Sequence, residues 1–254
     1  FYGDGFGKNF HILNLKETTD EEAVDTLLLG NLLSFFEQRL YFADKREEIR
    51  PYGLDPPLWL LVGSRVTTTN SDTLRFVQFL GRFLRNERGW SEKVVGKIFE
   101  GKSGIITTED GDLFTGHLNY LRERWGGNPD GASRKEIYHA ILGQVFNTGQ
   151  PGEMEILTIG ASKEEVGLRV SGCDDYFGLV YVSKAAEFAK KVAEQAPDLK
   201  VGDDAIVNPL FPTVKHADSA INLLVGAKKF MEGWSSWRVS NMGLLNVGRS
   251  EGSE

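Results

Sequence analysis

The segment from Ile221 to Val239 (INLLVGAKKFMEGWSSWRV) combines cations, aromatic rings and glycines directly after a predicted buried strand. The polar and aromatic residues that follow the strand end at Gly226 are Lys228, Lys229, Glu232, Gly233, Trp234, Ser235, Trp237 and Arg238. Lysines and tryptophans at this density favour a binding site, because ligands of open α/β sheets collect at the carboxyl ends of strands. The alternative is that Trp234 and Trp237 are core anchors on a short helix.

A second strand-to-loop segment, from Leu58 to Asp72, has the same organisation. A buried strand ends in Gly63, Ser64 and Arg65, and a polar run follows it. That run is Thr67, Thr68, Thr69, Asn70 and Ser71. Hydroxyls, backbone amides and an arginine ahead of a helix N-terminus can bind phosphate groups. A polar loop that leads into a capped helix explains the same residues equally well.

Other patterns that resemble functional motifs are interpreted as ordinary structure. Gly3–Lys8 (GDGFGK) lacks the preceding strand and the following Ser or Thr of a phosphate loop, so it indicates a glycine turn. Asp20–Ala23 (DEEA) follows polar residues, not an apolar strand, and indicates the first turn of a helix. The four histidines show no metal-ligand spacing, and the single cysteine is Cys173, so we expect no metal site.

Short apolar runs alternate with helical patterns, which is typical of an α/β fold with a parallel sheet flanked by helices. The predicted strands are residues 10–15, 58–62, 155–159, 178–182, 221–225 and 243–247, with 168–170 as a short hairpin partner. The predicted helices are residues 21–42, 72–84, 133–146 and 184–195. Ser133 and Glu136 form an apparent capping box, and Ser183 is the expected cap of the last helix. Residues 86–152 contain no convincing strand and predict a helical insertion, with helical stretches at 91–99 and 112–125.

The composition is that of a globular protein, with 254 residues, 41% hydrophobic and 26% charged. Its small polar end (Gly252–Glu254) and its start at Phe1 lead us to expect a fragment of a longer protein. The net charge of −7 argues against a protein that coats nucleic acid or membranes nonspecifically, although residues 64–102 carry eight basic and four acidic side chains. The lone cysteine and the lack of a long apolar run or signal peptide favour a cytoplasmic location without membrane contact.

Three segments together resemble a known family. They are residues 226–254 (GAKKFMEGWSSWRVSNMGLLNVGRSEGSE), 1–15 (FYGDGFGKNFHILNL) and 57–66 (PLWLLVGSRV). The chain is similar to DEAD/DEAH-box helicases of superfamily 2, and specifically to the ATP-dependent restriction (Res) subunit of type III restriction systems. The resemblance implies a RecA-like parallel sheet. It also implies that residues 1–57 are an inter-lobe linker with a strand and a long helix, and that residues 58–254 are the second, C-terminal motor lobe, truncated before the last helicase motif.

The resemblance also implies roles for individual residues. Those expected to contact the nucleic-acid backbone are Gly63, Ser64, Arg65, Thr67, Ser183, Lys184, Gly226, Lys228 and Lys229. Those expected to couple to the nucleotide are Glu232, Gly233, Trp234, Ser235 and Arg238. Ser235 stands where related motifs often carry Asp, and Ala227 stands where a hydroxyl is common. No catalytic residue and no metal ligand is assigned to this chain.

In such a motor, closure of two lobes on ATP and reopening after hydrolysis move the protein along DNA. The implied cofactors are ATP and Mg²⁺, bound mainly by the other lobe, so this chain alone is expected to be inactive as an ATP hydrolase. The implied partners are DNA, the upstream RecA-like lobe of the same chain and a modification methyltransferase subunit. The alternative function is a noncatalytic α/β module that binds a protein partner or a phosphorylated ligand through the same strand ends.

Overall fold

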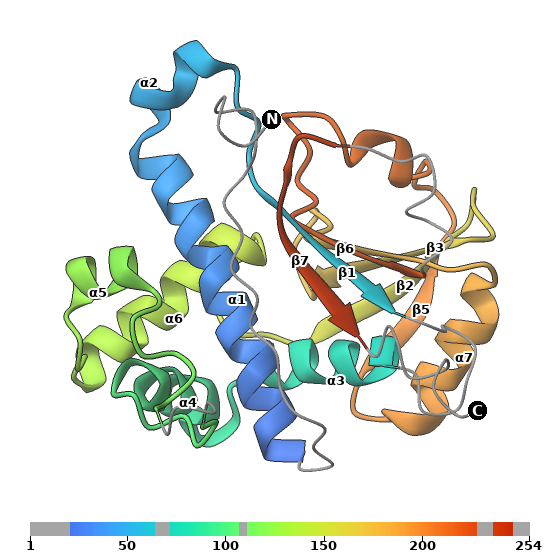
Figure 1. Ribbon diagram of the computed structural model, residues 1–254. Coiled ribbons are helices and arrows are strands. Elements are labelled where there is room, and N and C mark those ends of the chain that lie inside the picture. Colours follow the sequence, from blue (N-terminus) through green and yellow to red (C-terminus); the bar gives the residue numbers. More distant parts are fainter. Residues whose placement is uncertain (1–20, 64–71, 107–110, 228–235, 246–254) are drawn as a thin grey trace, which may run out of the picture.

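The computed structural model describes residues 21–63, 72–106, 111–227 and 236–245, which form an α/β fold (Figure 1). The helices are α1 (Glu21–Asp44), α2 (Arg46–Ile49), α3 (Asp72–Arg85), α4 (Trp90–Phe99), α5 (Asn119–Trp125), α6 (Gly131–Val145) and α7 (Ala185–Gln195). Short 3-10 turns are η1 (Arg50–Tyr52), η2 (Glu87–Gly89) and η3 (Phe211–Thr213). The strands are β1 (Leu58–Gly63), β2 (Met154–Ile159), β3 (Glu165–Val170), β4 (Gly178–Tyr181), β5 (Lys200–Asp204), β6 (Leu223–Ala227) and β7 (Val239–Leu245). Among these helices, none is long and apolar enough to cross a membrane.

One seven-stranded sheet has the order β5-β2-β3-β4-β6-β1-β7. Strand β1 pairs in parallel with β6 on one side and with β7 on the other, and β4 pairs in parallel with β6. Strand β3 is antiparallel to both β2 and β4. The sheet is therefore mixed and not wholly parallel, because β2, β3 and β4 follow one another through short antiparallel connections.

The apolar runs locate most of these strands correctly. The predictions for β1, β2, β4 and β6 are confirmed within about two residues, which is ordinary scatter for strand ends. The short partner at 168–170 is the end of a full strand, and β7 begins at Val239, earlier than its predicted start at 243. Strand β5 was missed because its sequence, KVGDD, is largely polar and shows no apolar run. The predicted strand at 10–15 lies outside the described residues.

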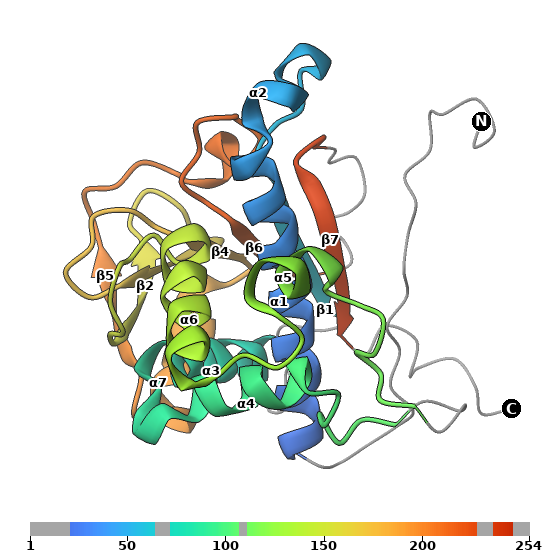
Figure 2. The same ribbon diagram turned by 90° about the vertical axis from the view of Figure 1, so that its left-hand side faces the viewer.

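The helices cover one face of the sheet. Buried side chains of α1, α3, α4, α5, α6 and α7 belong to one hydrophobic cluster with Trp59, Leu61, Ile156 and Val225 of the strands. In Figure 2, helices α1, α5 and α6 lie in front of the sheet. Alternate strand residues, such as Leu60 and Leu224, point to the opposite face and pack against Val214 and Ile221. Among the described residues, the segment from about 210 to 221, which contains η3, therefore covers this second face.

The starts of two helices differ from the predictions. Helix α6 is capped by Asp130, whose carboxylate accepts a hydrogen bond from the Ser133 amide at 2.8 Å, so the predicted capping box is wrong. Helix α7 has Lys184 at its N-cap with no side-chain cap hydrogen bond, so Ser183 does not cap it. By contrast, residues 21–23 of the acidic segment are helical, as predicted, because α1 is described from Glu21 onward; Asp20 lies outside the described residues.

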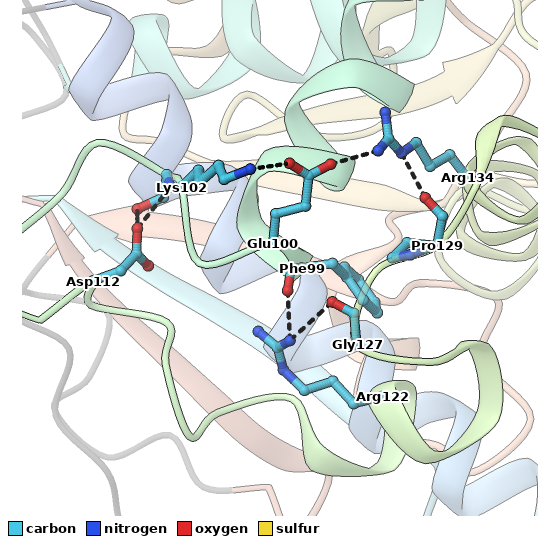
Figure 3. Close-up of polar contacts among 9 residues, drawn as sticks. Phe99, Glu100, Lys102, Asp112, Arg122, Gly127, Pro129 and Arg134 are labelled. Atoms are coloured by element: carbon cyan, nitrogen blue, oxygen red, sulfur yellow. Dashed lines mark hydrogen bonds and ion pairs between the residues drawn. The ribbon is translucent and has the colours of Figure 1, made fainter.

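Polar side chains tie the end of α4 to the segments that follow it (Figure 3). The Arg122 guanidinium donates to the Phe99 carbonyl at 2.5 Å, one of the carbonyls that a helix end leaves without a partner in the helix, and to the Ile98 carbonyl at 3.3 Å. Glu100 accepts a hydrogen bond from Arg134 of α6 at 2.5 Å. These contacts hold α4, α5 and α6 together, and the described part of residues 86–152 has no strand beyond one isolated bridge, from Ile106 to Asp112.

Candidate nucleic-acid interface at the carboxyl edge of the sheet

Predicted site residues from three separate chain segments meet at the carboxyl edge of neighbouring strands. Gly63 ends β1 and pairs in register with Ala227, and Val62 pairs with Gly226 of β6. Gly226 also pairs with Tyr181, the last residue of β4. Ser183 and Lys184 follow β4 after the buried Val182 and are exposed. The order β4-β6-β1 therefore brings Gly63, Gly226, Ser183 and Lys184 to one edge.

The winding of the chain reverses at this edge. The strand that follows β4 in the chain is β5, at one end of the strand order, whereas the strand that follows β6 is β7, at the other end. Strands β4 and β6 are direct neighbours, so this reversal lies between them. In open α/β sheets, ligands bind outside the carboxyl ends of strands at such a switch point.

The N-terminal turn of α3 packs against the end of β1. A Cβ atom added to Gly63 would lie 3.2 Å from the Thr73 hydroxyl oxygen, which shows how closely the strand end approaches the helix. Thr73 is fully buried, and its hydroxyl has no hydrogen-bond partner in the described structure. Orphan amides of a helix start and a nearby hydroxyl can together bind an anion. Thr73 was not predicted from the sequence, although its position in the first turn of a predicted helix was a usable signal.

The end of β4 carries both charges and a hydrogen-bonded phenol. The Tyr181 hydroxyl donates to Glu164 at 2.6 Å, and this hydrogen bond, with partial burial, raises the pKa of Tyr181 to about 12. The Lys184 ammonium donates to Glu187 at 2.7 Å, and both side chains are about 61% exposed. An exposed pair of this kind is weak, so Lys184 can exchange its glutamate for another anion.

Arg238 does not join these residues. It is 1% exposed and its backbone carbonyl accepts a hydrogen bond from the amide of Leu58, the first residue of β1. Its guanidinium donates to the carbonyls of Pro56 at 3.0 Å, Ile221 at 2.9 Å and Val214. Arg238 therefore lies at the amino edge of the sheet, opposite Gly63, where it satisfies backbone carbonyls of three segments.

The alternative that Trp234 and Trp237 are core anchors on a short helix can be tested at Trp237. Trp237 is 87% exposed, so it is not a core anchor. The remaining predicted site residues lie outside the described residues; they are Ser64, Arg65, Thr67, Lys228, Lys229, Glu232, Gly233, Trp234 and Ser235.

The predicted residues at the carboxyl edge do not fit Mg²⁺. Gly63, Gly226, Ser183 and Lys184 supply backbone groups, one hydroxyl and one ammonium, whereas Mg²⁺ prefers carboxylate and phosphate oxygens. Across the described ranges, no group of three or more His, Cys, Asp or Glu side chains could hold a metal ion. Backbone amides, a hydroxyl and a lysine instead suit phosphate oxygens.

Comparison of the chain with protein-family models, with curated proteins and with solved structures finds no match in any of the three.

Proposed function

We propose that this chain is the second, RecA-like motor lobe of an ATP-dependent DNA helicase or translocase, of the kind found in type III restriction systems. One observation carries the proposal: Gly63, Gly226, Ser183 and Lys184 meet at the carboxyl edge of adjacent strands, at the switch point of the sheet. The family resemblance assigns these same residues to the nucleic-acid backbone, and the mixed α/β sheet is compatible with a RecA-like lobe.

The chemistry of this edge supports contact with phosphates and not with base edges. Gly63 and Gly226 are buried near the ends of β1 and β6, and the start of α3, where the first amides of a helix can bind an anion, lies beside Gly63. Lys184 adds an exposed positive charge on an exchangeable ion pair. Backbone contacts of this kind position a protein on DNA without reading its sequence, which is what a motor requires.

Binding of labelled DNA by the 254-residue chain tests the proposal. We expect fluorescence anisotropy to show binding that weakens steeply between about 50 mM and about 200 mM salt, because phosphate contacts release counterions. Lys184→Gln should weaken binding and reduce the salt slope on duplex DNA by about one. The double variant Lys228→Ala with Lys229→Ala should do the same more strongly.

Lys190→Gln is the matched control for Lys184→Gln. Lys190 also lies on α7, is 78% exposed and pairs with a glutamate, Glu194, but it is more than a helical turn from the strand end. We expect DNA binding by the Lys190→Gln variant to have the same salt slope as binding by the unchanged chain. Unchanged binding in both the Lys184 variant and the double lysine variant would overturn the proposed interface. Hydrolysis of ATP by the chain alone at an ordinary helicase rate would contradict the assignment of catalysis to the other lobe.

A further inference from the structure

A cavity of about 740 Å³ lies at the amino edge of the sheet, opposite the proposed nucleic-acid interface. The end of α1, helix α2 and the turn at 217–219 line it, Pro56, just before β1, forms part of its wall, and the cavity is open to solvent on one side. Figure 1 shows α2 at the end of α1 that lies away from α3. The cavity is therefore separate from Gly63 and Gly226.

Arginines dominate the charge of this cavity. Arg39 of α1, Arg46 of α2 and Arg50 of η1 all line it. The carboxylates in its wall are Glu47 and Asp218. Glu47 approaches Arg50 only to 3.9 Å, and both of these side chains are highly exposed. The wall thus carries an excess of positive charge.

Arg39 has no carboxylate partner among the described residues. Its guanidinium donates to the Gln144 carbonyl at 3.1 Å and to the Pro57 carbonyl at 3.4 Å. The buried guanidinium of Arg238 lies nearby, held by backbone carbonyls, with Asp55 and Asp218 acting on it only at longer range. Burial, and then repulsion by Arg238, lower the pKa of Arg39 to about 10, so Arg39 stays charged at neutral pH. Arg39 is partly buried and has no ion pair within the described part of the chain, and a second positive charge, Arg238, is buried beside it, which favours an anion against Arg39 in the cavity.

We propose that this cavity binds a small organic phosphate, with the phosphate group on Arg39 and Arg46. The planar guanidinium of an arginine matches the geometry of a phosphate group and can donate two parallel hydrogen bonds to its oxygens. Phe42, Ile49 and Leu54 supply apolar wall for the remainder of such a molecule. The volume falls within the range of about 300–1,000 Å³ that is typical of small-molecule sites.

Calorimetric titration of the full chain with AMP, inorganic phosphate and a single-stranded oligonucleotide tests this site. We expect saturable binding of AMP and weaker binding of inorganic phosphate, which lacks the apolar part. Arg46→Gln should weaken AMP binding about tenfold, the effect of losing one charge-assisted hydrogen bond. Arg46 is exposed and makes no ion pair within the described ranges, so its removal leaves the fold intact.

Arg88→Gln is the matched control, because Arg88 is exposed and does not line the cavity. Its AMP affinity should equal that of the unchanged chain. Arg39→Lys keeps a charge but loses the planar fork, and it should weaken AMP binding while the circular dichroism spectrum stays unchanged. The absence of saturable AMP binding, or equal affinities in the Arg46 and Arg88 variants, would overturn the proposal. Arg46-dependent binding of the oligonucleotide without AMP binding would overturn it as well.

Discussion

Glu155 lies at the centre of a charged cluster that links three strands. Its carboxylate accepts hydrogen bonds from Lys200 of β5, from Arg169 of β3 at 2.7 Å and from Ser171 at 3.1 Å. The side chain of Glu155 is 7% exposed. The hydrogen bond from Lys200, followed by those from Arg169 and Ser171, outweighs burial and lowers the pKa of Glu155 from 4.5 to about 2. Glu155 therefore stabilises the folded protein in its ionised form.

We predict that Glu155→Gln lowers the free energy of unfolding by about 2 kcal/mol near neutral pH. The pKa of Glu155 is lower in the folded state, so its contribution is present above pH 4.5 and is lost as the pH falls from 4.5 toward 2. Urea unfolding at about pH 7 and about pH 3.5 checks this, because the difference between the two proteins should shrink at the lower pH. An equal difference at both pH values would show that Glu155 acts through packing and not through its charge.

Helix α1 contacts the segment around Phe114 so closely that only glycine fits at one position. A Cβ atom on Gly30 would lie 2.0 Å from the Phe114 ring, and Phe114 is 1% exposed. Gly143 of α6 is the opposite case, because it is exposed and a Cβ atom there meets nothing within 4 Å. The two helical glycines therefore have different reasons to be present.

We predict opposite effects of alanine at these two positions. Gly30→Ala should destabilise the protein by about 1–3 kcal/mol, because the strain of displacing the Phe114 ring exceeds the gain in helix propensity. Gly143→Ala should stabilise it by about 0.5–1 kcal/mol, since only the propensity changes. Urea unfolding measures both. A stabilising Gly30→Ala would mean that the Phe114 segment is not packed on α1.

Across the whole described structure, the helices and the sheet share one hydrophobic core. Fully buried residues of α1 (Phe35), α4 (Val95) and α6 (Ile141) belong to the same cluster as Trp59 of β1. Phe35 and Trp59 stack with ring centroids 5.8 Å apart. Elements that share a core unfold together in small two-state proteins.

We therefore predict that α6 and β1 unfold in one cooperative transition. Native-state hydrogen exchange should give similar opening free energies for the amides of Ile137–Leu142 and Leu60–Val62. Circular dichroism and tryptophan fluorescence should follow the same urea transition. A much lower opening free energy for α6 would instead identify residues 86–152 as an independently unfolding insertion.

The α/β class, most strand and helix positions and the segments that end at the carboxyl edge follow from the amino-acid sequence alone. Those features depend on local apolar runs and helical periodicity, which are readable along the chain. Strand β5 escaped notice because its stability comes from pairing with β2 and from the contact of Lys200 with Glu155, and neither is local. The α6 cap was misjudged because both Asp130 and Ser133 suit a helix start.

Which of the predicted residues lie together in one site depends on the tertiary fold. Gly63 and Gly226 are far apart in the chain but neighbouring in the sheet, because strand order places β6 beside β1. Arg238 is close to Gly226 in sequence, yet it lies at the opposite edge, because the chain returns there before it enters β7 in parallel with β1. The arginine-lined cavity likewise depends on α1 meeting the turn at 217–219 across the fold. Strand order and helix packing decide which of these segments become neighbours, and neither can be read from the local sequence.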